Sequence, residues 1–110
     1  MRRTLLLAML AVLGFTVSAQ AAEPTRLELT LRDHKFVPTE LRAPAGVPIE
    51  ITLKNEDPTA EEFESKDLHR EKIIPGGGTI RLPMGPLKPG NYTFFGEFNP
   101  KTAHGNLIAK

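Results

Sequence analysis

The sequence predicts an all-β domain, an aligned two-sheet sandwich of about seven strands. Apolar residues alternate with charged or polar ones at a period of two in residues 26–32 and 47–55, which is typical of half-buried strands. Ten prolines and nine glycines in 110 residues favour many turns and disfavour long helices. No internal repeat or low-complexity linker divides the chain, so we expect one folded unit.

The predicted strands follow one another at short intervals. In RLELTLR the alternating residues are Leu27, Leu29 and Leu31, and VPIEITLKN repeats the pattern from Val47 to Leu53. Five more extended segments follow, EFES (62–65), DLHREKII (67–74), TIRLP (79–83), NYTFFGE (91–97) and GNLIAK (105–110). Turns are predicted between them at PTE (38–40), APAG (43–46), NEDPTA (55–60), PGGG (75–78) and GPLKPG (85–90).

The N-terminus has the pattern of a secretory signal peptide. Arg2 and Arg3 form a basic region, an apolar run extends from residue 5 to residue 17, and Ala19-Gln20-Ala21 supplies a small-x-small cleavage pattern. We therefore expect a signal peptide at residues 1–21 and a mature domain at residues 22–110. The apolar run is too short and too soon followed by polar residues for a membrane anchor, so no membrane insertion of the mature chain is expected.

Composition excludes some classes of function. Removal of Arg2 and Arg3 leaves 12 of the 14 Lys and Arg residues against 13 Asp and Glu, a mature net charge of −1. Without a basic run, a nucleic-acid surface is not expected. The chain has no cysteine, so packing alone has to stabilise it.

Several motifs together resemble the cupredoxin family across nearly the whole mature chain. They are Phe36 with Pro38, the turn at Ala45-Gly46, a strand ending in Asn55, and Pro89-Gly90 followed by Tyr92. The resemblance implies a cupredoxin-like Greek-key β-sandwich, with a metal-binding loop after the strand that contains Tyr92.

The resemblance also assigns the positions of blue-copper ligands. A family histidine falls on Glu61, two residues before Phe63, and the family cysteine falls on Gly96. The loop histidine and the methionine fall near Lys101 and Ala103. A type 1 copper centre needs a cysteine thiolate, so a chain without cysteine cannot form one.

Oxygen donors and one imidazole remain at this end of the sandwich. Strand alternation places Glu61 and Phe63 on the inner face and Glu62 and Glu64 on the outer face. We predict that Glu61, Glu97 and His104 converge on one metal site, with solvated loop residues as the alternative. Carboxylate and imidazole suit iron, manganese, zinc or oxidised copper better than cuprous ion. Of these, the family resemblance implies an iron or copper ion as the cofactor.

Other polar side chains are read as structural. His34 and His69 are expected on the surface, His69 within a strand, while Asp67, Arg70 and Glu71 are expected to form weak surface ion pairs. Met84 is expected to fill the core.

A narrower resemblance concerns function. The strings EEFESKDL, REKIIPGG, GPLKPGNYTFFGEF and TAHGNL are similar to cupredoxin-like periplasmic proteins that accompany bacterial iron permeases. This implies a periplasmic metal-binding accessory protein of iron uptake, with iron permease components as partners. A ferroxidase-like enzyme and a metal-free adaptor for a partner protein remain alternatives, and the sequence leaves oligomeric state open.

Overall fold

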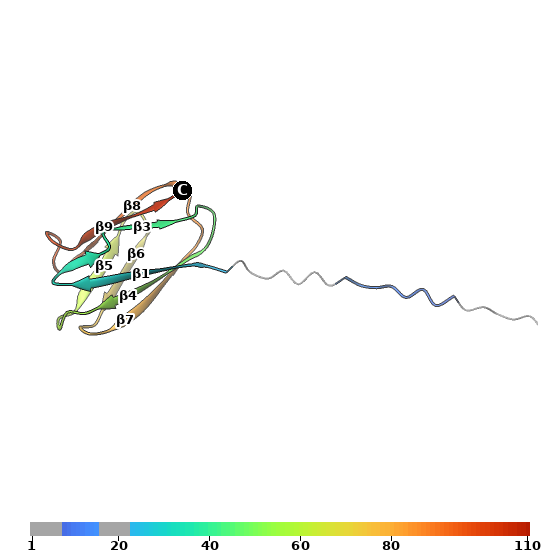
Figure 1. Ribbon diagram of the computed structural model, residues 1–110, viewed down its shortest axis with the longest axis horizontal. Helices are drawn as coiled ribbons and strands as arrows, with labels where there is room; N and C mark the ends of the chain where they lie inside the picture. Colours follow the sequence, from blue (N-terminus) through green and yellow to red (C-terminus); the bar gives the residue numbers. More distant parts are fainter. Residues whose placement is uncertain (1–7, 16–22) are drawn as a thin grey trace, which may run out of the picture.

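Two packed β-sheets form the domain (Figure 1). The structure is a computed structural model that describes residues 8–15 and 23–110, and these residues contain no helix. Their nine strands are β1 (Thr25–Arg32), β2 (Lys35–Val37), β3 (Glu40–Ala43), β4 (Ile49–Asn55), β5 (Glu61–Ser65), β6 (Arg70–Ile74), β7 (Thr79–Met84), β8 (Gly90–Gly96) and β9 (His104–Ala109). The expected all-β sandwich is confirmed.

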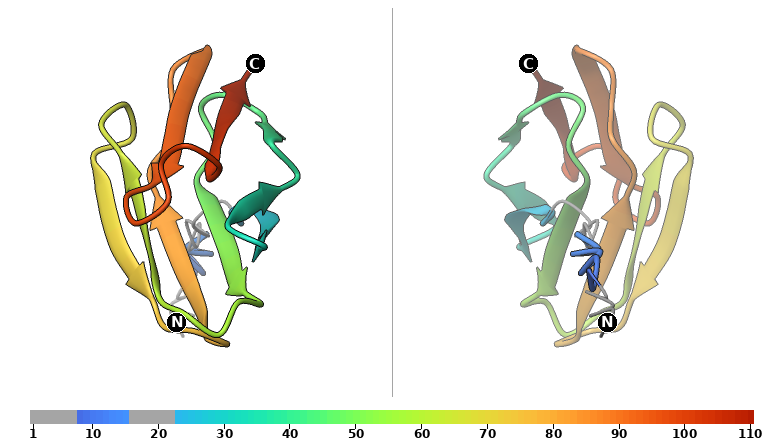
Figure 2. Two further views of the ribbon diagram at one scale, coloured as in Figure 1. Left: turned by 90° about the vertical axis from the view of Figure 1, so that its left-hand side faces the viewer. Right: turned by 90° about the vertical axis from the view of Figure 1, so that its right-hand side faces the viewer.

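The sheets have four and five strands within residues 23–110. Their orders are β2-β1-β4-β7 and β3-β9-β8-β5-β6. Figure 2 shows the strands from the two ends of the view in Figure 1. Most neighbours are antiparallel, but β1 pairs with β4 and β3 with β9 in parallel. The parallel pair of β1 and β4 arises because the chain crosses between them to the second sheet to form β3, so β4 returns in the direction of β1.

Three phenylalanine rings fill the core between the sheets. Phe36, Phe63 and Phe94 are each no more than 1% exposed. The centroid of Phe94 lies 5.3 Å from that of Phe36 and 5.2 Å from that of Phe63. Aliphatic residues of β1 and β4 surround them with the alternation that the sequence predicts.

The segment around Pro38 differs most from the sequence prediction. Residues 38–40 were expected to be a turn alone, but two short strands flank the turn and bring the count from about seven to nine in the described residues. Phe36 and Leu41 are the buried residues of these strands. β2 and β3 have three and four residues, too few to show a period of two.

The predicted strand at residues 67–74 begins three residues late, because residues 66–69 form a turn. His69 lies in this turn with φ 54°, so its placement within a strand was wrong. The expected ion pairs of this segment are replaced by other contacts: Asp67 accepts hydrogen bonds from the backbone N–H and hydroxyl of Thr93. These bonds lower the pKa of Asp67 below its usual value.

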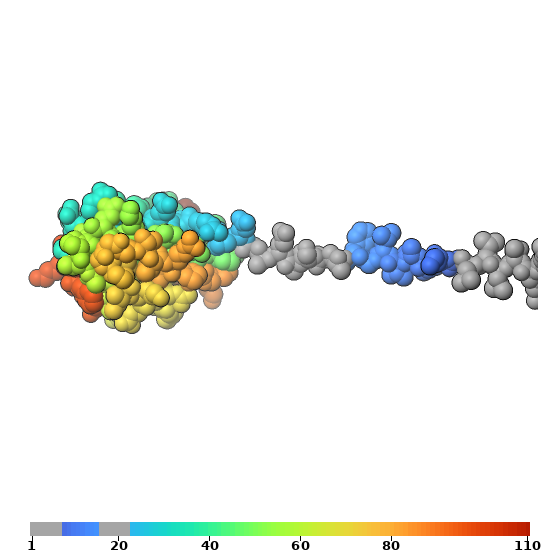
Figure 3. Space-filling model, turned by 90° about the horizontal axis from the view of Figure 1, so that it is seen from below, coloured from blue at the N-terminus to red at the C-terminus, as the bar shows by residue number. Residues whose placement is uncertain are grey.

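Arg70 joins the two sheets at their edges. Its Nη2 donates to the carbonyl of Pro83 over 2.9 Å, which connects β6 with β7. Figure 3 shows these two strands side by side, as yellow and orange surface, with the loop after β8 at one end of the molecule. Met84 at the end of β7 is buried, as expected for a core residue.

One end of the sandwich gathers the loops that matter for function. Asn55, at the end of β4, donates through Nδ2 to the carbonyls of Thr59, Ile74 and Pro75 and accepts from the N–H of Asp57. The Asp57 carboxylate in turn accepts from the backbone N–H groups of residues 33 and 34, both at positive φ. His34 is exposed in this turn, which matches its expected surface position. The loop of residues 97–103, between β8 and β9, lies at the same end (Figure 1).

The predicted cleavage site before residue 22 lies outside the described residues. Residues 8–15, from the apolar run, are described and have no regular secondary structure. The signal peptide therefore stays a prediction.

Candidate functional site

The loop of residues 97–103 has the position at which the resemblance expects a metal loop. It is short and closed by its own backbone, since the N–H of Gly96 donates to Ala103 and the N–H of Ala103 donates to Asn99, both over 2.8 Å. The N–H of Glu97 also donates to the carbonyl of Glu62, which binds the start of the loop to β5. The loop therefore has a defined shape.

Glu61 is buried beneath this loop. It opens β5, is 1% exposed and points inward like Phe63, as alternation predicts. Its Oε1 accepts hydrogen bonds from the N–H groups of Glu62 (2.9 Å) and Phe98 (2.8 Å), and its Oε2 accepts one from Asn99 Nδ2 (2.7 Å). Both carboxylate oxygens are thus bonded to protein donors.

Gly96 leaves room for that carboxylate. A Cβ built on Gly96 would lie 2.7 Å from Glu61 Cδ and 2.8 Å from the Cβ of Ala103, closer than real atoms approach. The residue at the family's cysteine position therefore cannot carry a side chain while Glu61 keeps its place.

His104 lies on the other face of the same sheet. Directly paired residues of neighbouring strands point to the same side, so one row crosses the outer face from Glu71 through Glu64 and Phe95 to His104. Glu61 faces inward, which puts β-sheet backbone between its carboxylate and the imidazole. Two strand spacings, about 10 Å, separate His104 from Glu64.

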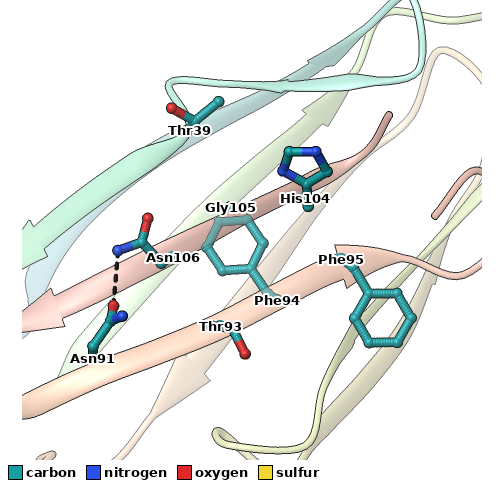
Figure 4. A pocket seen from close by; sticks show the side chains of 8 residues that line it. All are labelled: Thr39, Asn91, Thr93, Phe94, Phe95, His104, Gly105 and Asn106. Atoms are coloured by element: carbon teal, nitrogen blue, oxygen red, sulfur yellow. Dashed lines mark hydrogen bonds between the residues drawn. The ribbon is translucent and has the colours of Figure 1, made fainter. Parts of the chain in front are cut away.

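A shallow groove runs beside His104. It has a volume of about 670 Å³ and lies along β8 and β9, with Phe95 and His104 at one end and the hydrogen-bonded pair Asn91 and Asn106 at the other (Figure 4). Gly105 leaves room for the buried ring of Phe94 beneath the groove, since a Cβ there would lie 2.7 Å from the ring and from the carbonyl of Thr39.

Four glutamates gather on the outer face next to this loop. We call Glu62, Glu64, Glu71 and Glu97 the outer acidic cluster. Glu64 lies directly opposite Glu71 on β6. A proton on one member of the pair Glu64 and Glu97, or of the pair Glu62 and Glu71, would form a hydrogen bond to the other carboxylate. The sequence predicts Glu71 only as a member of surface ion pairs, and the cross-strand register that places it opposite Glu64 is the signal of its part in the cluster.

The cluster raises the pKa of two of its members. The pKa of Glu64 rises above its usual 4.5 through the hydrogen bond with Glu97, then through partial desolvation and the charges of Glu97 and Glu71. The pKa of Glu62 rises in the same way, first through the hydrogen bond with Glu71. Four carboxylates this close repel one another when ionised, and a cation would relieve the repulsion.

Replacing Glu64 with Gln is expected to raise the melting temperature at pH 7 and to have little effect at pH 4.5. A folded-state pKa above the unfolded value means that the folded protein binds the proton more tightly. The ionised cluster therefore destabilises the fold above the raised pKa, and this penalty is relieved as pH falls toward 4.5. Thermal melts from pH 7.5 to 4.5 measure the difference. An equal gain at both pH values, or an equal gain in the exposed control Glu28→Gln, would contradict the repulsion.

The three predicted metal ligands thus have different surroundings. Glu61 is inside and bonded to the loop, Glu97 belongs to the outer acidic cluster, and His104 is on the outer face beyond Phe95. Among residues 8–15 and 23–110, no three His, Cys, Asp or Glu side chains are arranged as a ready metal site. The assignment of these residues as ligands stays a prediction.

A type 1 copper ion does not fit the residues at this end. Gly96 stands at the cysteine position without space for a side chain, and Glu61 at the histidine position already accepts three hydrogen bonds. A blue-copper centre requires two imidazoles and a thiolate.

Comparison with known proteins identifies the family of the chain. Residues 5–109 match the family model described as cupredoxin-like domain. A relative, the uncharacterized protein RP394 of Rickettsia prowazekii (strain Madrid E), is 46% identical over 82 residues, which cover 74% of this chain and 66% of that protein. The chain thus spans slightly less than two thirds of this relative's length.

Solved structures agree on the fold. Auracyanin A, a blue copper protein from Chloroflexus aurantiacus, superimposes with a TM-score of 0.69 at 15% identity, covering 80% of this chain and all of that one. The metal-binding domain of the Cu(I)-exporting P-type ATPase CopA of Streptococcus pneumoniae D39 gives 0.65 at 17% identity, covering 77% and 84%. Within the described residues, no helix has the length and apolar character to cross a membrane.

Proposed function

Because the chain belongs to the cupredoxin-like domain family, we propose that it is an exported accessory protein of ferrous iron uptake that binds a divalent metal ion as cargo through carboxylate oxygens. It acts in the periplasm beside iron permease components and carries no type 1 copper centre. The signal-peptide pattern and the resemblance to permease-associated proteins support the compartment and the partner.

The donor set at the loop end is the observation that carries this proposal. The chain has no cysteine to supply the family's soft sulfur ligand, and the outer acidic cluster lies beside the loop on the outer face of the sheet. Carboxylate oxygens suit harder divalent ions such as ferrous iron and manganous ion better than cuprous ion. An exposed cluster suits cargo that must be released again, because hydrated carboxylates bind such ions loosely.

Glu97 and Glu64 are the members of the cluster that we place first as ligands. Glu97 is a predicted ligand from the sequence, and its carboxylate lies near enough to that of Glu64 to raise the pKa of Glu64. His104 faces the same side of the sheet, and a side-chain movement across Phe95 would be needed for it to join. Glu61 remains a predicted ligand only for a state in which its bonds to the loop are broken.

An adaptor without metal is the second candidate, and exposed apolar side chains favour it. Phe98 is 51% exposed in the loop and Val37 is 49% exposed on β2. An adaptor would show no stabilisation by metal, because only a ligand that binds the folded state raises the melting temperature. A ferroxidase-like enzyme would in addition turn bound ferrous ion into ferric ion.

Anaerobic thermal melts of residues 22–110 with ferrous, cupric and zinc ions test the proposal. We expect ferrous iron to raise the melting temperature and cupric ion to produce no intense thiolate-to-copper absorption. Glu97→Gln should reduce the ferrous shift, while the exposed control Glu28→Gln should keep it. The absence of a shift with any of the three ions would favour the adaptor, and appearance of ferric ion on admission of oxygen, faster than in buffer, would favour the enzyme.

A further inference from the structure

We propose that the buried Glu61 carboxylate fastens the loop of residues 97–103 without a metal ion, and that it fills the space into which a side chain at position 96, the cysteine position of the resemblance, would project. The proposal is independent of metal binding by the outer acidic cluster. It concerns what holds the loop when no metal is present.

The hydrogen bonds of Glu61 reach across the chain to the loop. The carboxylate on β5 accepts from the backbone N–H of Phe98 and from the side chain of Asn99, 37 and 38 residues further on. A third bond, from the N–H of Glu62, holds the carboxylate itself in place. Hydrogen bonds to an ionised acceptor are about twice as strong as neutral ones, so three donors on one carboxylate form a firm attachment.

The space that the carboxylate fills is the space into which a side chain at position 96 would project. The Cβ position of Gly96 lies 2.7 Å from Glu61 Cδ and 2.9 Å from Oε2. A carboxylate at position 61 and a thiolate at position 96 therefore exclude each other. Ala103, 0% exposed, closes the remaining side with its Cβ 2.8 Å from the same point.

Because Glu61 is buried, its carboxylate depends on the hydrogen-bond donors of the loop. Glu61 is 1% exposed, and among the described residues it forms no ion pair. A buried carboxylate without a cation has to be compensated by hydrogen bonds, and the loop supplies two of the three donors. If the loop opened, the buried carboxylate would lose two of its three hydrogen-bond donors. Glu61 therefore stabilises the closed position of the loop.

Amide hydrogen exchange on the metal-free mature domain tests this inference. We expect the N–H of Phe98 to be protected in the wild type without any metal. In Glu61→Ala its exchange should be about ten- to a hundredfold faster, the loss expected when one charged hydrogen bond is removed. Glu28→Gln, an exposed glutamate on β1 outside the outer acidic cluster, is the control and should leave the exchange of Phe98 unchanged.

Chemical rescue adds a second readout. Glu61→Ala leaves a cavity lined by the three donors, so formate is expected to raise the melting temperature of this variant and to slow the exchange of Phe98 again. Phe63→Ala leaves an apolar cavity nearby and should not respond to formate. If Glu61→Ala does not fold alone, its recovery in formate supports the inference and its failure to recover contradicts it.

Two results would overturn the inference. One is an unprotected Phe98 amide in the metal-free wild type. The other is a folded Glu61→Ala variant with the wild-type exchange rate at Phe98. Neither depends on whether the outer acidic cluster binds ferrous iron.

Discussion

Truncation of Phe63 to alanine is expected to lower the free energy of unfolding by about 3–5 kcal/mol. The ring is fully buried on β5, stacked on Phe94 with centroids 5.2 Å apart and edge-on to Phe36 at 6.2 Å. Its removal takes away the middle of the aromatic cluster, and the flanking strands cannot collapse into the space without breaking their ladders. Urea unfolding of residues 22–110, followed by circular dichroism, measures the loss.

Phe98→Ala is the control for that measurement. The same side chain is removed, but from a position that is 51% exposed, so a change within about 0.5 kcal/mol is expected. Equal losses in the two variants would contradict the placement of Phe63 in the core.

Replacement of Asn55 by alanine is expected to cost about 2–4 kcal/mol, since several buried backbone groups lose their partner together. Asn55 is 0% exposed and bonds to the carbonyls of Thr59, Ile74 and Pro75 and to the N–H of Asp57. These bonds join the end of β4 to the loops that precede β5 and β7. The same denaturant titration measures the effect.

Asn91→Ala provides the matched comparison. Asn91 is exposed, and its side chain bonds only to Asn106 among the described residues, so its loss should stay within about 0.5 kcal/mol. A small effect at both positions would show that Asn55 does not hold the loops.

The strand pattern was the most predictable part of the fold. In β1 and β4 the period of two identified the buried residues, and in β5 it placed Glu61 and Phe63 inside and Glu62 and Glu64 outside. These strands bury one face against the core and leave the other partly exposed, so the alternation of apolar and polar residues indicates which side chains are buried.

Strand direction and the short strands could not be predicted in the same way. The parallel pairing of β1 with β4 depends on where the chain crosses between sheets, which local alternation does not record. β2 and β3 are too short to show a period, and their burial comes from contacts with distant strands.

The resemblance predicts which residues lie at the candidate site, but the sequence does not predict the hydrogen bonds and charges around them. The resemblance places Glu61 at a ligand position. Its hydrogen-bond donors, however, include the backbone N–H of Phe98, 37 residues further on, and no sequence pattern predicts that contact. The burial of Glu61 and its three hydrogen bonds lead us to expect that Glu61→Ala lowers the stability of the domain. The grouping of Glu97 with Glu64 and Glu71 likewise depends on strand register.

Anaerobic calorimetric titration of ferrous iron into the mature domain at pH 7 tests the central claim most directly. We expect the wild type to bind the ion and the double variant Glu64→Gln/Glu97→Gln to bind it about tenfold more weakly or worse, since two ligand charges are lost. The double variant Glu23→Gln/Glu28→Gln changes net charge equally at exposed positions outside the cluster and should bind like the wild type. Absence of binding by the wild type, or equal affinity in the two double variants, would contradict a carboxylate site for divalent metal on this face.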